Sequence, residues 1–281
     1  MRKLYLDNPN KGLSFLYNNA AGRIILKPLV SSALVSKIVG LYMSSFLSIP
    51  LIKPFIRKNN IDLTEYEDKK YTSFNDFFIR KRKDSYLNIS MDKNDFISPC
   101  DCKLTVYKID DNLTFNIKNT KYDVSSLIND EMLAKEYNNG YVLVFRLSPN
   151  DYHRYCFIDD GILKKTYNIK GKFHTVSPIV YDKFSVFKEN TRCVSIFDSK
   201  NFDKLLQIEV GALLVGKIKN YDLKKVNKAT EKGYFMFGGS TIVIVVKENK
   251  VIIDNDILVN SEDGYETLIK YGDKIGKKYV K

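Results

Sequence analysis

The chain has 281 residues, of which 44% are hydrophobic and 28% charged, and this composition is typical of a globular protein rather than a disordered one. Lysine and arginine exceed aspartate and glutamate by 45 to 33, so the formal net charge is +12. This charge favours anionic partners such as nucleic acid, an acidic membrane or a phosphorylated substrate, although a solvated lysine-rich surface is an alternative explanation.

The four cysteines are too few for a disulfide framework in a chain of this length, and residues 1–20 lack the pattern of a cleavable signal sequence. We therefore expect a reducing, cytoplasmic compartment. Cys100 and Cys102 form a C-x-C pair, which lacks the C-x-x-C spacing of a zinc knuckle, and only two histidines are present to complete a site. No metal site is expected.

The segment from Ile24 to Phe55 is the most apolar part of the chain, but three lysines and three prolines interrupt it. Its longest uncharged run, residues 38–52, is shorter than the roughly 20 residues that a spanning helix needs, so we do not expect a transmembrane anchor. Helical spacing of apolar residues predicts amphipathic helices that either lie on a bilayer surface or pack on the core. A polar linker is expected around residues 59–70.

After Tyr71 the pattern changes to short β-branched and aromatic runs bounded by turn residues, which predicts a mostly antiparallel β domain. The expected strands cover residues 103–109, 141–147, 161–167, 193–197, 205–218, 241–246 and 251–253. A short helix is expected near residues 124–136. The prediction is an α+β protein, with a helical membrane-associating region over residues 1–70 and a β-rich domain over residues 71–281.

The segment Phe237-Gly238-Gly239-Ser240-Thr241 places a hydroxyl residue after two glycines, at the start of an apolar run. Glycines permit a strained turn and a close approach to the carbonyl group. The pentapeptide alone fits an ordinary Gly-Gly turn better than a reactive site. It does not fit a nucleophile elbow, because G-x-S-x-G requires a glycine where Ile242 stands.

Two further residues are candidates for chemistry. His153 follows the turn at the end of a strong strand, and imidazole titrates near neutrality, so it is a candidate general base, with a structural histidine as the alternative. Asp101 lies in the turn Ser98-Pro99-Cys100-Asp101, where most aspartates bond their own backbone. With Ser240 these residues supply a nucleophile, a base and a group to orient the base.

Taken together, the motifs resemble those of phosphatidylserine decarboxylases over most of residues 25–281. The matching segments are residues 73–80 (SFNDFFIR), 98–101 (SPCD), 147–154 (LSPNDYHR), 171–178, 211–212, 215–216, 233–241 and, near the end, 266–267 and 272–276. The resemblance implies that the peptide bond between Gly239 and Ser240 breaks without an external protease. It would leave a β chain of residues 1–239 and an α chain of residues 240–281 that stays within the sheet.

The resemblance also implies a pyruvoyl-dependent carboxy-lyase. The Ser240 hydroxyl would attack the Gly239 carbonyl, the resulting ester would eliminate, and the dehydroalanine at position 240 would hydrolyse to the pyruvoyl cofactor. Its ketone would form a Schiff base with phosphatidylserine and accept the electrons released with CO2, giving phosphatidylethanolamine. The implied partners are phosphatidylserine in an anionic membrane and the two self-cleaved chains as a heterodimer, with higher oligomers left open. The implied location is peripheral, on the cytoplasmic side of the cell membrane.

Residue by residue, the resemblance assigns Asp101 and Ser240 to the family's triad and puts His153 in its histidine motif. Many members read His-Arg-x-His, with the later histidine often assigned to the triad, but this chain has Cys156 there. A thiol is mostly neutral near pH 7, so we expect His153 to be the base and His174 an auxiliary residue. The leading alternative is a lipid-binding relative that Cys156 has made unable to mature. A nucleic-acid-binding protein is the third hypothesis. It ranks below the other two because the chain contains no recognisable nucleic-acid-binding motif.

Overall fold

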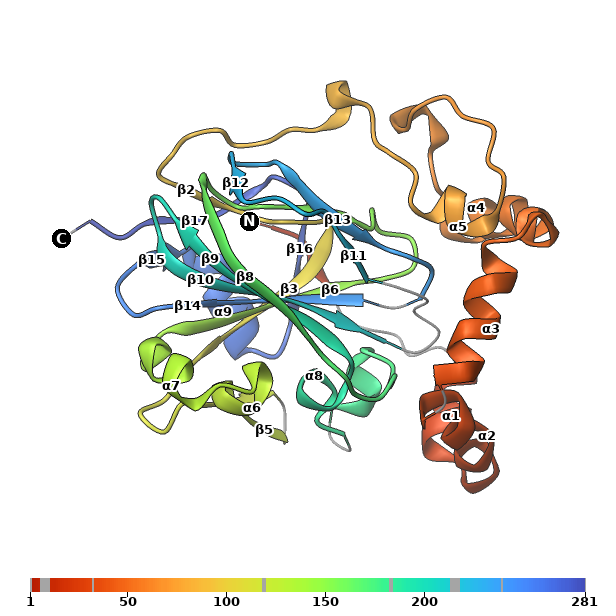
Figure 1. The fold of residues 1–281 in the computed structure, drawn as a ribbon, viewed down its shortest axis with the longest axis horizontal. Helices are drawn as coiled ribbons and strands as arrows, with labels where there is room; N and C mark the ends of the chain where they lie inside the picture. Colours follow the sequence, from red (N-terminus) through yellow and green to blue (C-terminus); the bar gives the residue numbers. More distant parts are fainter. Residues whose placement is uncertain are drawn as a thin grey trace.

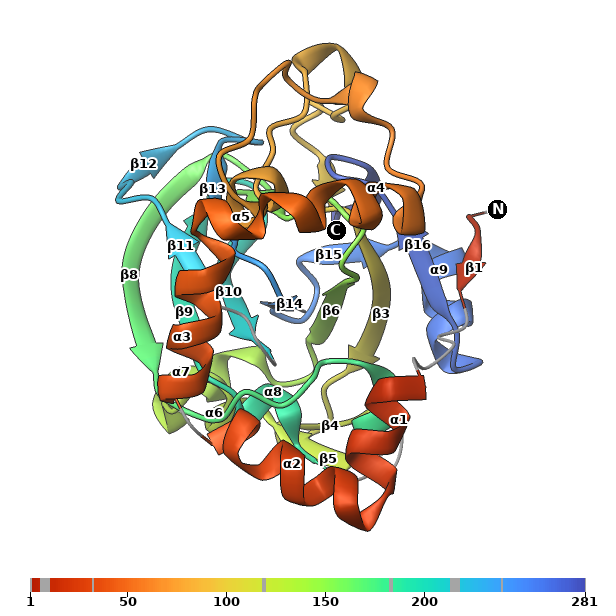
Figure 2. The same cartoon turned by 90° about the vertical axis from the view of Figure 1, so that its right-hand side faces the viewer.

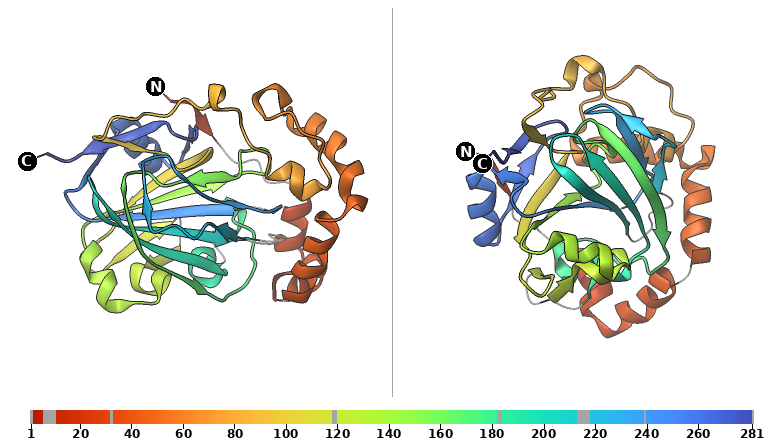
Figure 3. Two further views of the ribbon diagram at one scale, coloured as in Figure 1. Left: turned by 45° about the horizontal axis from the view of Figure 1, so that its top comes forward. Right: turned by 60° about the vertical axis from the view of Figure 1, so that its left-hand side comes forward.

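The structure is a computed structural model that describes residues 2–5, 11–31, 33–117, 120–181, 184–212, 218–238 and 240–280. N-terminal helices are followed by a predominantly antiparallel β domain, which confirms the predicted α+β class (Figure 1). The N-terminal helices are α1 (Lys11–Asn18), α2 (Ala20–Ser31), α3 (Ala33–Met43), the 3₁₀ helix η1 (Phe46–Leu51) and α4 (Ile52–Asn59). They gather at one end of the sheet, opposite the C-terminal strands (Figure 3).

A nine-stranded antiparallel sheet forms the centre of the molecule and curves around its interior (Figure 2). In spatial order its strands are β1 (Leu4–Tyr5), β16 (Glu266–Ile269), β3 (Cys102–Lys108), β6 (Tyr141–Leu147), β14 (Ser240–Val246), β10 (Asp203–Gly211), β9 (Arg192–Ser199), β8 (Gly161–Ile169) and β12 (Lys225–Val226). Strand β14 lies between β6 and β10, so the strand that begins with Ser240 has a hydrogen-bonded neighbour on both sides.

All seven residues of β14 are buried, because both faces of the sheet are covered. Ile242, Ile244 and Val246 pack into one hydrophobic cluster, whereas Val243 and Val245 pack into a second cluster on the opposite face. A strand without a solvent-facing side reads as a continuous apolar run. This explains why the sequence STIVIVV lacks the usual polar alternation.

Smaller elements cover the two faces. Three further sheets are formed by β11 (Ile218–Asn220), β13 (Glu231–Phe235) and β7 (Arg154–Cys156); by β15 (Val251–Ile253), β17 (Lys274–Lys278) and β2 (Asp95–Ile97); and by β4 (Thr114–Ile117) with β5 (Thr120–Asp123). The remaining helices are η2 (Leu63–Glu65), α5 (Phe74–Phe78), η3 (Asp84–Tyr86), α6 (Val124–Ile128), α7 (Glu131–Ala134), η4 (Lys135–Tyr137), η5 (Pro178–Val180), α8 (Val186–Glu189) and α9 (Asn255–Glu262).

The predicted strands correspond closely to β3, β6, β8, β9, β14 and β15. The run predicted over residues 205–218 was too long, because β10 ends at Gly211 and Ile218 starts β11 in another sheet. The Asn190 side chain donates to the Gly211 carbonyl oxygen at 2.8 Å, where β10 ends. The helix predicted near residues 124–136 is divided into short helices, because Asn129 adopts a positive φ of 55° between α6 and α7.

The segment predicted as a linker does not run free of the β domain. Tyr66 is buried in the same hydrophobic cluster as one face of β14, and it forms an isolated β-bridge with Arg82. The ring of Tyr66 also lies under the guanidinium group of Arg80, 4.4 Å from its centre. The chain between α4 and α5 therefore packs against the β domain.

A fully buried ion pair joins the β11–β13–β7 sheet to the central sheet. Lys232 Nζ donates to both carboxylate oxygens of Glu209, at 2.8 and 2.9 Å, and the two side chains are 1% and 0% exposed. A β-bulge between Glu231 and Gly233 turns Lys232 toward the interior. Asn220 accepts from Lys232 at 3.1 Å and donates to Glu209 at 3.0 Å, which completes the network.

We expect Lys232→Met to lower the free energy of unfolding by about 3–5 kcal/mol, because it leaves the Glu209 carboxylate buried without its cation. The double change Glu209→Leu with Lys232→Met should cost much less, since no buried charge remains. Denaturant unfolding of a Ser240→Ala chain, used to keep the polypeptide in one piece, measures both. Equal losses in the single and the double variant would contradict this role of the ion pair.

Candidate active site

Ser240 stands at the head of the central strand, opposite Leu147 on one side and Gly211 on the other. Its side chain is fully buried, and its Oγ has no hydrogen-bond partner among the described residues. Burial of an unpaired hydroxyl costs about 1–3 kcal/mol, so such a group requires an explanation, of which a catalytic role is one. Gly238 has a φ of 144°, which favours glycine, and Gly239 lies outside the described residues.

His153 presents a free proton acceptor inside the protein. Its Nδ1 lies 2.8 Å from the carbonyl oxygen of Asp151. A carbonyl oxygen only accepts, so in the neutral ring the proton is on Nδ1 and the lone pair is on Nε2. Nε2 is buried and has no partner in the described structure. Burial lowers the pKa of His153 to about 3, so the imidazole is neutral at physiological pH.

The segment that leads to Ser240 packs against His153. The N–H of Phe235 donates to the His153 carbonyl oxygen at 3.0 Å. The ring of Phe78 lies 4.1 Å from the ring of His153 and 5.4 Å from that of Phe237. Asn75 accepts a hydrogen bond from the Phe237 N–H at 2.9 Å. The histidine and the residues before Ser240 therefore belong to one packed cluster.

The carboxylate of Asp101 is hydrogen-bonded to residues other than histidine. It accepts hydrogen bonds from Arg82 Nη2 at 2.9 Å and from the N–H of Tyr271 at 2.8 Å. Although burial alone would raise the pKa of Asp101, the hydrogen bonds and charge of Arg82 hold it below its ordinary value. Within the described structure, no hydrogen bond joins Asp101 to His153 or His174. The three expected triad residues are therefore not linked in series.

Position 156 lies beside the turn that carries Asp101. The N–H of Cys156 donates to the carbonyl oxygen of Pro99 at 3.0 Å, and its thiol hydrogen-bonds the Tyr271 hydroxyl. Burial raises the pKa of the Cys156 thiol to about 12, so it is protonated at neutral pH. A thiol that keeps its proton cannot take the place of a base.

His174 lies in the loop between β8 and η5 and is connected through Asn190 to the residue paired with Ser240. The Asn190 side chain donates to the carbonyl oxygens of both His174 and Gly211, at 2.8 Å each, and Gly211 pairs with Ser240. The His174 ring stacks on Phe184, with ring centres 4.3 Å apart. Burial lowers the pKa of His174. The Asn190 side chain therefore bridges the backbone of His174 and the backbone of Gly211, the residue that pairs with Ser240.

Sequence reasoning missed the side chains that hold these groups in place. They are Asn75, Arg82, Asn190 and Tyr271. Only Asn75 carried a signal, because it falls within the matched segment of residues 73–80, whereas the other three act through contacts distant in sequence. Among the described residues, no three His, Cys, Asp or Glu side chains converge as metal ligands.

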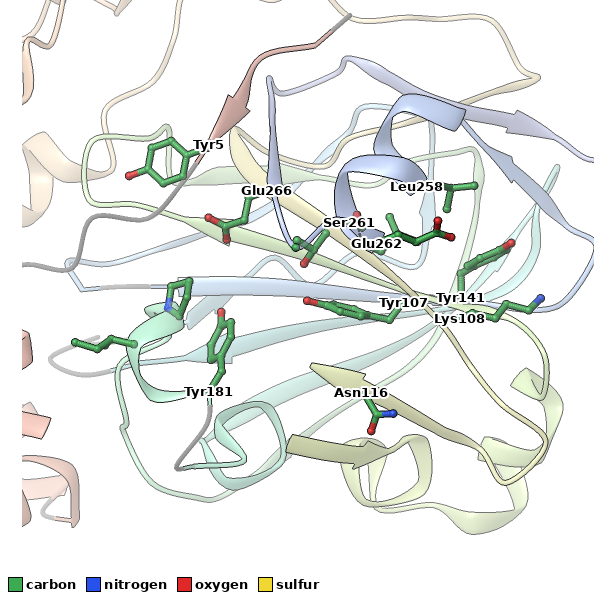
Figure 4. A pocket seen from close by; sticks show the side chains of 15 residues that line it. Tyr5, Tyr107, Lys108, Asn116, Tyr141, Tyr181, Leu258, Ser261, Glu262 and Glu266 are labelled. Carbon is green, nitrogen blue, oxygen red and sulfur yellow. Dashed lines mark hydrogen bonds between the residues drawn. The ribbon is translucent and has the colours of Figure 1, made fainter. Parts of the chain in front are cut away.

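A separate cavity of about 730 Å³ lies between β3, η5 and α9 (Figure 4). Tyr107, Tyr181 and Glu266 line it. Arg146 Nε donates to Glu266 at 2.7 Å, so this carboxylate is already paired. Neither Ser240 nor the two histidines line this cavity, and we therefore place the chemistry elsewhere.

The chain is similar to known proteins over almost its whole length. A protein from Clostridium acetobutylicum named phosphatidylserine decarboxylase proenzyme 2 is 51% identical over 279 residues, which cover 99% of this chain and 96% of that protein. Phosphatidylserine decarboxylase proenzymes from Clostridium tetani and Clostridium botulinum (strain 657) are 44% and 43% identical, over 96% and 95% of this chain and 92% and 93% of theirs. The family model described as phosphatidylserine decarboxylase matches residues 74–277. The chain therefore belongs to the phosphatidylserine decarboxylase family.

Proposed function

We propose that this chain is a proenzyme that converts Ser240 into a pyruvoyl group and then decarboxylates phosphatidylserine to phosphatidylethanolamine. Family membership supports the decarboxylase activity, and the proenzyme names of the relatives support maturation by cleavage rather than a non-processing lipid-binding role. The observation that carries the proposal is the Ser240 hydroxyl, which is buried at the head of the central strand and has no partner among the residues that the structure describes.

The surroundings of residue 240 fit such a group. The pairings with Leu147 and Gly211 come from strands that precede the cleavage point, so residue 240 stays in place when its bond to residue 239 breaks. Strand β14 of the α chain, residues 240–281, remains inserted between β6 and β10, and the two products form a heterodimer. A pyruvoyl group at this position supplies an electron sink for the pair released with CO2.

We assign the proton acceptor for maturation to His153. Its hydrogen bond to the Asp151 carbonyl fixes the tautomer with the lone pair on Nε2, and this nitrogen has no competing partner in the described structure. The attack of the Ser240 hydroxyl on the carbonyl carbon of residue 239 requires that the hydroxyl lose its proton. We assign Asp101 to positioning the turn of residues 98–101 through Arg82 and Tyr271, and His174 to the later decarboxylation or substrate binding.

Exposed apolar side chains on the N-terminal helices support a peripheral location on an anionic membrane. Ile38, Leu41 and Phe46 are 58%, 68% and 72% exposed, which argues against a helical layer that merely packs on the core. Exposed lysines stand among them. No described helix is both long and apolar enough to span a bilayer alone, although a pair bent by 80°, Val35–Met43 with Phe46–Asn59, meets both criteria together.

We expect Ser240→Ala to remain a single polypeptide, because the nucleophile for cleavage is lost. The unchanged protein should give two chains, with an α chain that begins at residue 240 and resists Edman degradation. Denaturing electrophoresis and intact-mass measurement distinguish these outcomes. Normal cleavage of Ser240→Ala would rule out Ser240 as the precursor of the cofactor.

His153→Gln should slow maturation by about 10²–10⁴-fold, the usual contribution of a general base. His174→Gln should mature more nearly at the normal rate and lose CO2 release instead. A time course of chain cleavage, scored separately from CO2 release, checks both. Normal cleavage by His153→Gln would contradict the assignment.

The pH dependence of the cleavage rate provides a control on the protonation state assigned to His153. Because burial keeps the pKa of His153 near 3, the imidazole remains neutral from pH 8 to pH 6, and the cleavage rate should not fall over this range through its protonation.

We expect Leu41→Glu with Phe46→Glu to weaken binding to phosphatidylserine vesicles, because two apolar contacts with the bilayer are lost. Met132→Glu is the matched control, since Met132 is also highly exposed but lies on α7, outside the N-terminal helices. Vesicle sedimentation measures binding, and turnover of a short-chain, soluble phosphatidylserine should be unchanged. Equal vesicle binding by both variants would exclude this surface as the docking site.

A further inference from the structure

Arg80 is a buried cation without an anionic partner among the described residues. Its side chain is 3% exposed, and neither Nε nor Nη1 has a hydrogen-bond partner. Nη2 donates only to the Tyr66 hydroxyl, at 3.3 Å. The rings of Tyr66 and Phe77 lie 4.4 and 4.9 Å from the guanidinium carbon. These contacts stabilise the charge through the ring faces but leave the N–H groups of Nε and Nη1 unused.

Each of the other well-buried arginines of the described structure has a carboxylate or several backbone carbonyls as partners, although Arg82 Nε makes no hydrogen bond and lies 3.4 Å from a carboxylate oxygen of Glu65. Arg82 binds Asp101 at 2.9 Å, and Arg146 Nε binds Glu266 at 2.7 Å. Arg192 lacks a carboxylate but donates to four backbone carbonyls, those of Ser126, Leu127, Lys188 and Asn190. A buried guanidinium with unused donors is costly unless an anion binds it. Arg80 therefore has the properties of a ligand-binding residue rather than a structural one.

Arg80 is close to the candidate active site. The preceding carbonyl, of Ile79, accepts from Arg154 at 2.8 Å, and the ring of Phe78 lies 4.1 Å from that of His153. After the dominant effect of burial, the positive charge of Arg80 also contributes to the lowered pKa of His153. The guanidinium group and the free imidazole nitrogen thus belong to the same buried region.

The helix before Arg80 also connects the active site with the exposed apolar helices. Asn75 on α5 donates to Ser44 at 2.9 Å and accepts from the N–H of Phe237, while the N–H of Phe74 donates to Ser48 in η1 at 2.8 Å. The region of Arg80 therefore lies between the proposed membrane-docking residues and the segment before Ser240. This is where the headgroup of a bilayer lipid would enter.

We propose that Arg80 binds the phosphodiester of the lipid headgroup, an inference that rests on the proposed function. Phosphatidylserine offers two anions, and guanidinium groups bind both carboxylates and phosphates well. A cation on the departing carboxylate would stabilise the charge that the reaction must remove, and so raise the barrier. The phosphodiester keeps its charge throughout. Because Nε and Nη1 are covered, the headgroup reaches them only when the surrounding side chains move.

Two soluble probes separate these anions. Glycerophosphoethanolamine carries the phosphodiester without a carboxylate, and L-serine carries the carboxylate without a phosphate. In the uncut Ser240→Ala chain, adding Arg80→Gln should weaken glycerophosphoethanolamine binding tenfold or more, measured by ligand-observed NMR, and leave serine binding unchanged. The glycerophosphoethanolamine affinity of Arg80→Lys should lie between that of the Arg80 chain and that of Arg80→Gln, since lysine keeps the charge but not the planar donor geometry. Lys81→Gln, which removes an exposed neighbouring cation, is the matched control.

In the mature enzyme, Arg80→Gln should raise KM for short-chain phosphatidylserine at least tenfold and change kcat less than threefold, because the contact is equal in the ground and transition states. Undiminished glycerophosphoethanolamine binding by Arg80→Gln and Arg80→Lys would overturn the proposal. Selective loss of serine binding would also overturn it, in favour of the carboxylate. The binding measurements use an uncut chain and do not depend on maturation. A failure of maturation would therefore contradict the proposed function but would not change the binding results.

Discussion

The structure depends on the pairing of β14 with two strands that precede it in the sequence. Backbone hydrogen bonds to β6 and β10 fix residue 240 from both sides, and burial of all seven residues of β14 fixes the strand within the core. A chain cut before residue 240 therefore loses one covalent bond but none of the contacts that hold the new end. Self-cleavage is compatible with this fold because the sheet, and not the peptide bond, determines where Ser240 lies.

Burial also sets the chemistry around that strand. The same desolvation that keeps His153 neutral keeps the Cys156 thiol protonated, so burial preserves the histidine as a proton acceptor and disables the cysteine. The hydrogen bonds and charge of Arg82, with smaller contributions from Lys270 and the Tyr271 N–H, offset the burial of Asp101 and favour its ionised form. Arg80 has no such companion among the described residues. Among the described residues, His153 Nε2 and Arg80 are thus unpaired buried groups near the segment that leads to Ser240, as the proposed meeting of serine and anionic headgroup requires.

The sequence predicted local features well and distant contacts poorly. The run after Ser240 was predicted as a strand because buried β-branched residues carry a strong local signal, and the substitution at Cys156 was apparent from the motif alone. The Arg82–Asp101 pair and the inward turn of Lys232 could not be predicted, since they depend on strand register and a β-bulge. Helix α9 was missed because its apolar periodicity is weak.

The most direct test of the account is the intact mass of the purified protein before and after treatment with a hydrazine, which adds to ketones. The account predicts an α-chain species, residues 240–281, whose first residue has the mass of a pyruvoyl group and which gains one hydrazone. A single species with the mass of the full chain and no hydrazine adduct would contradict it.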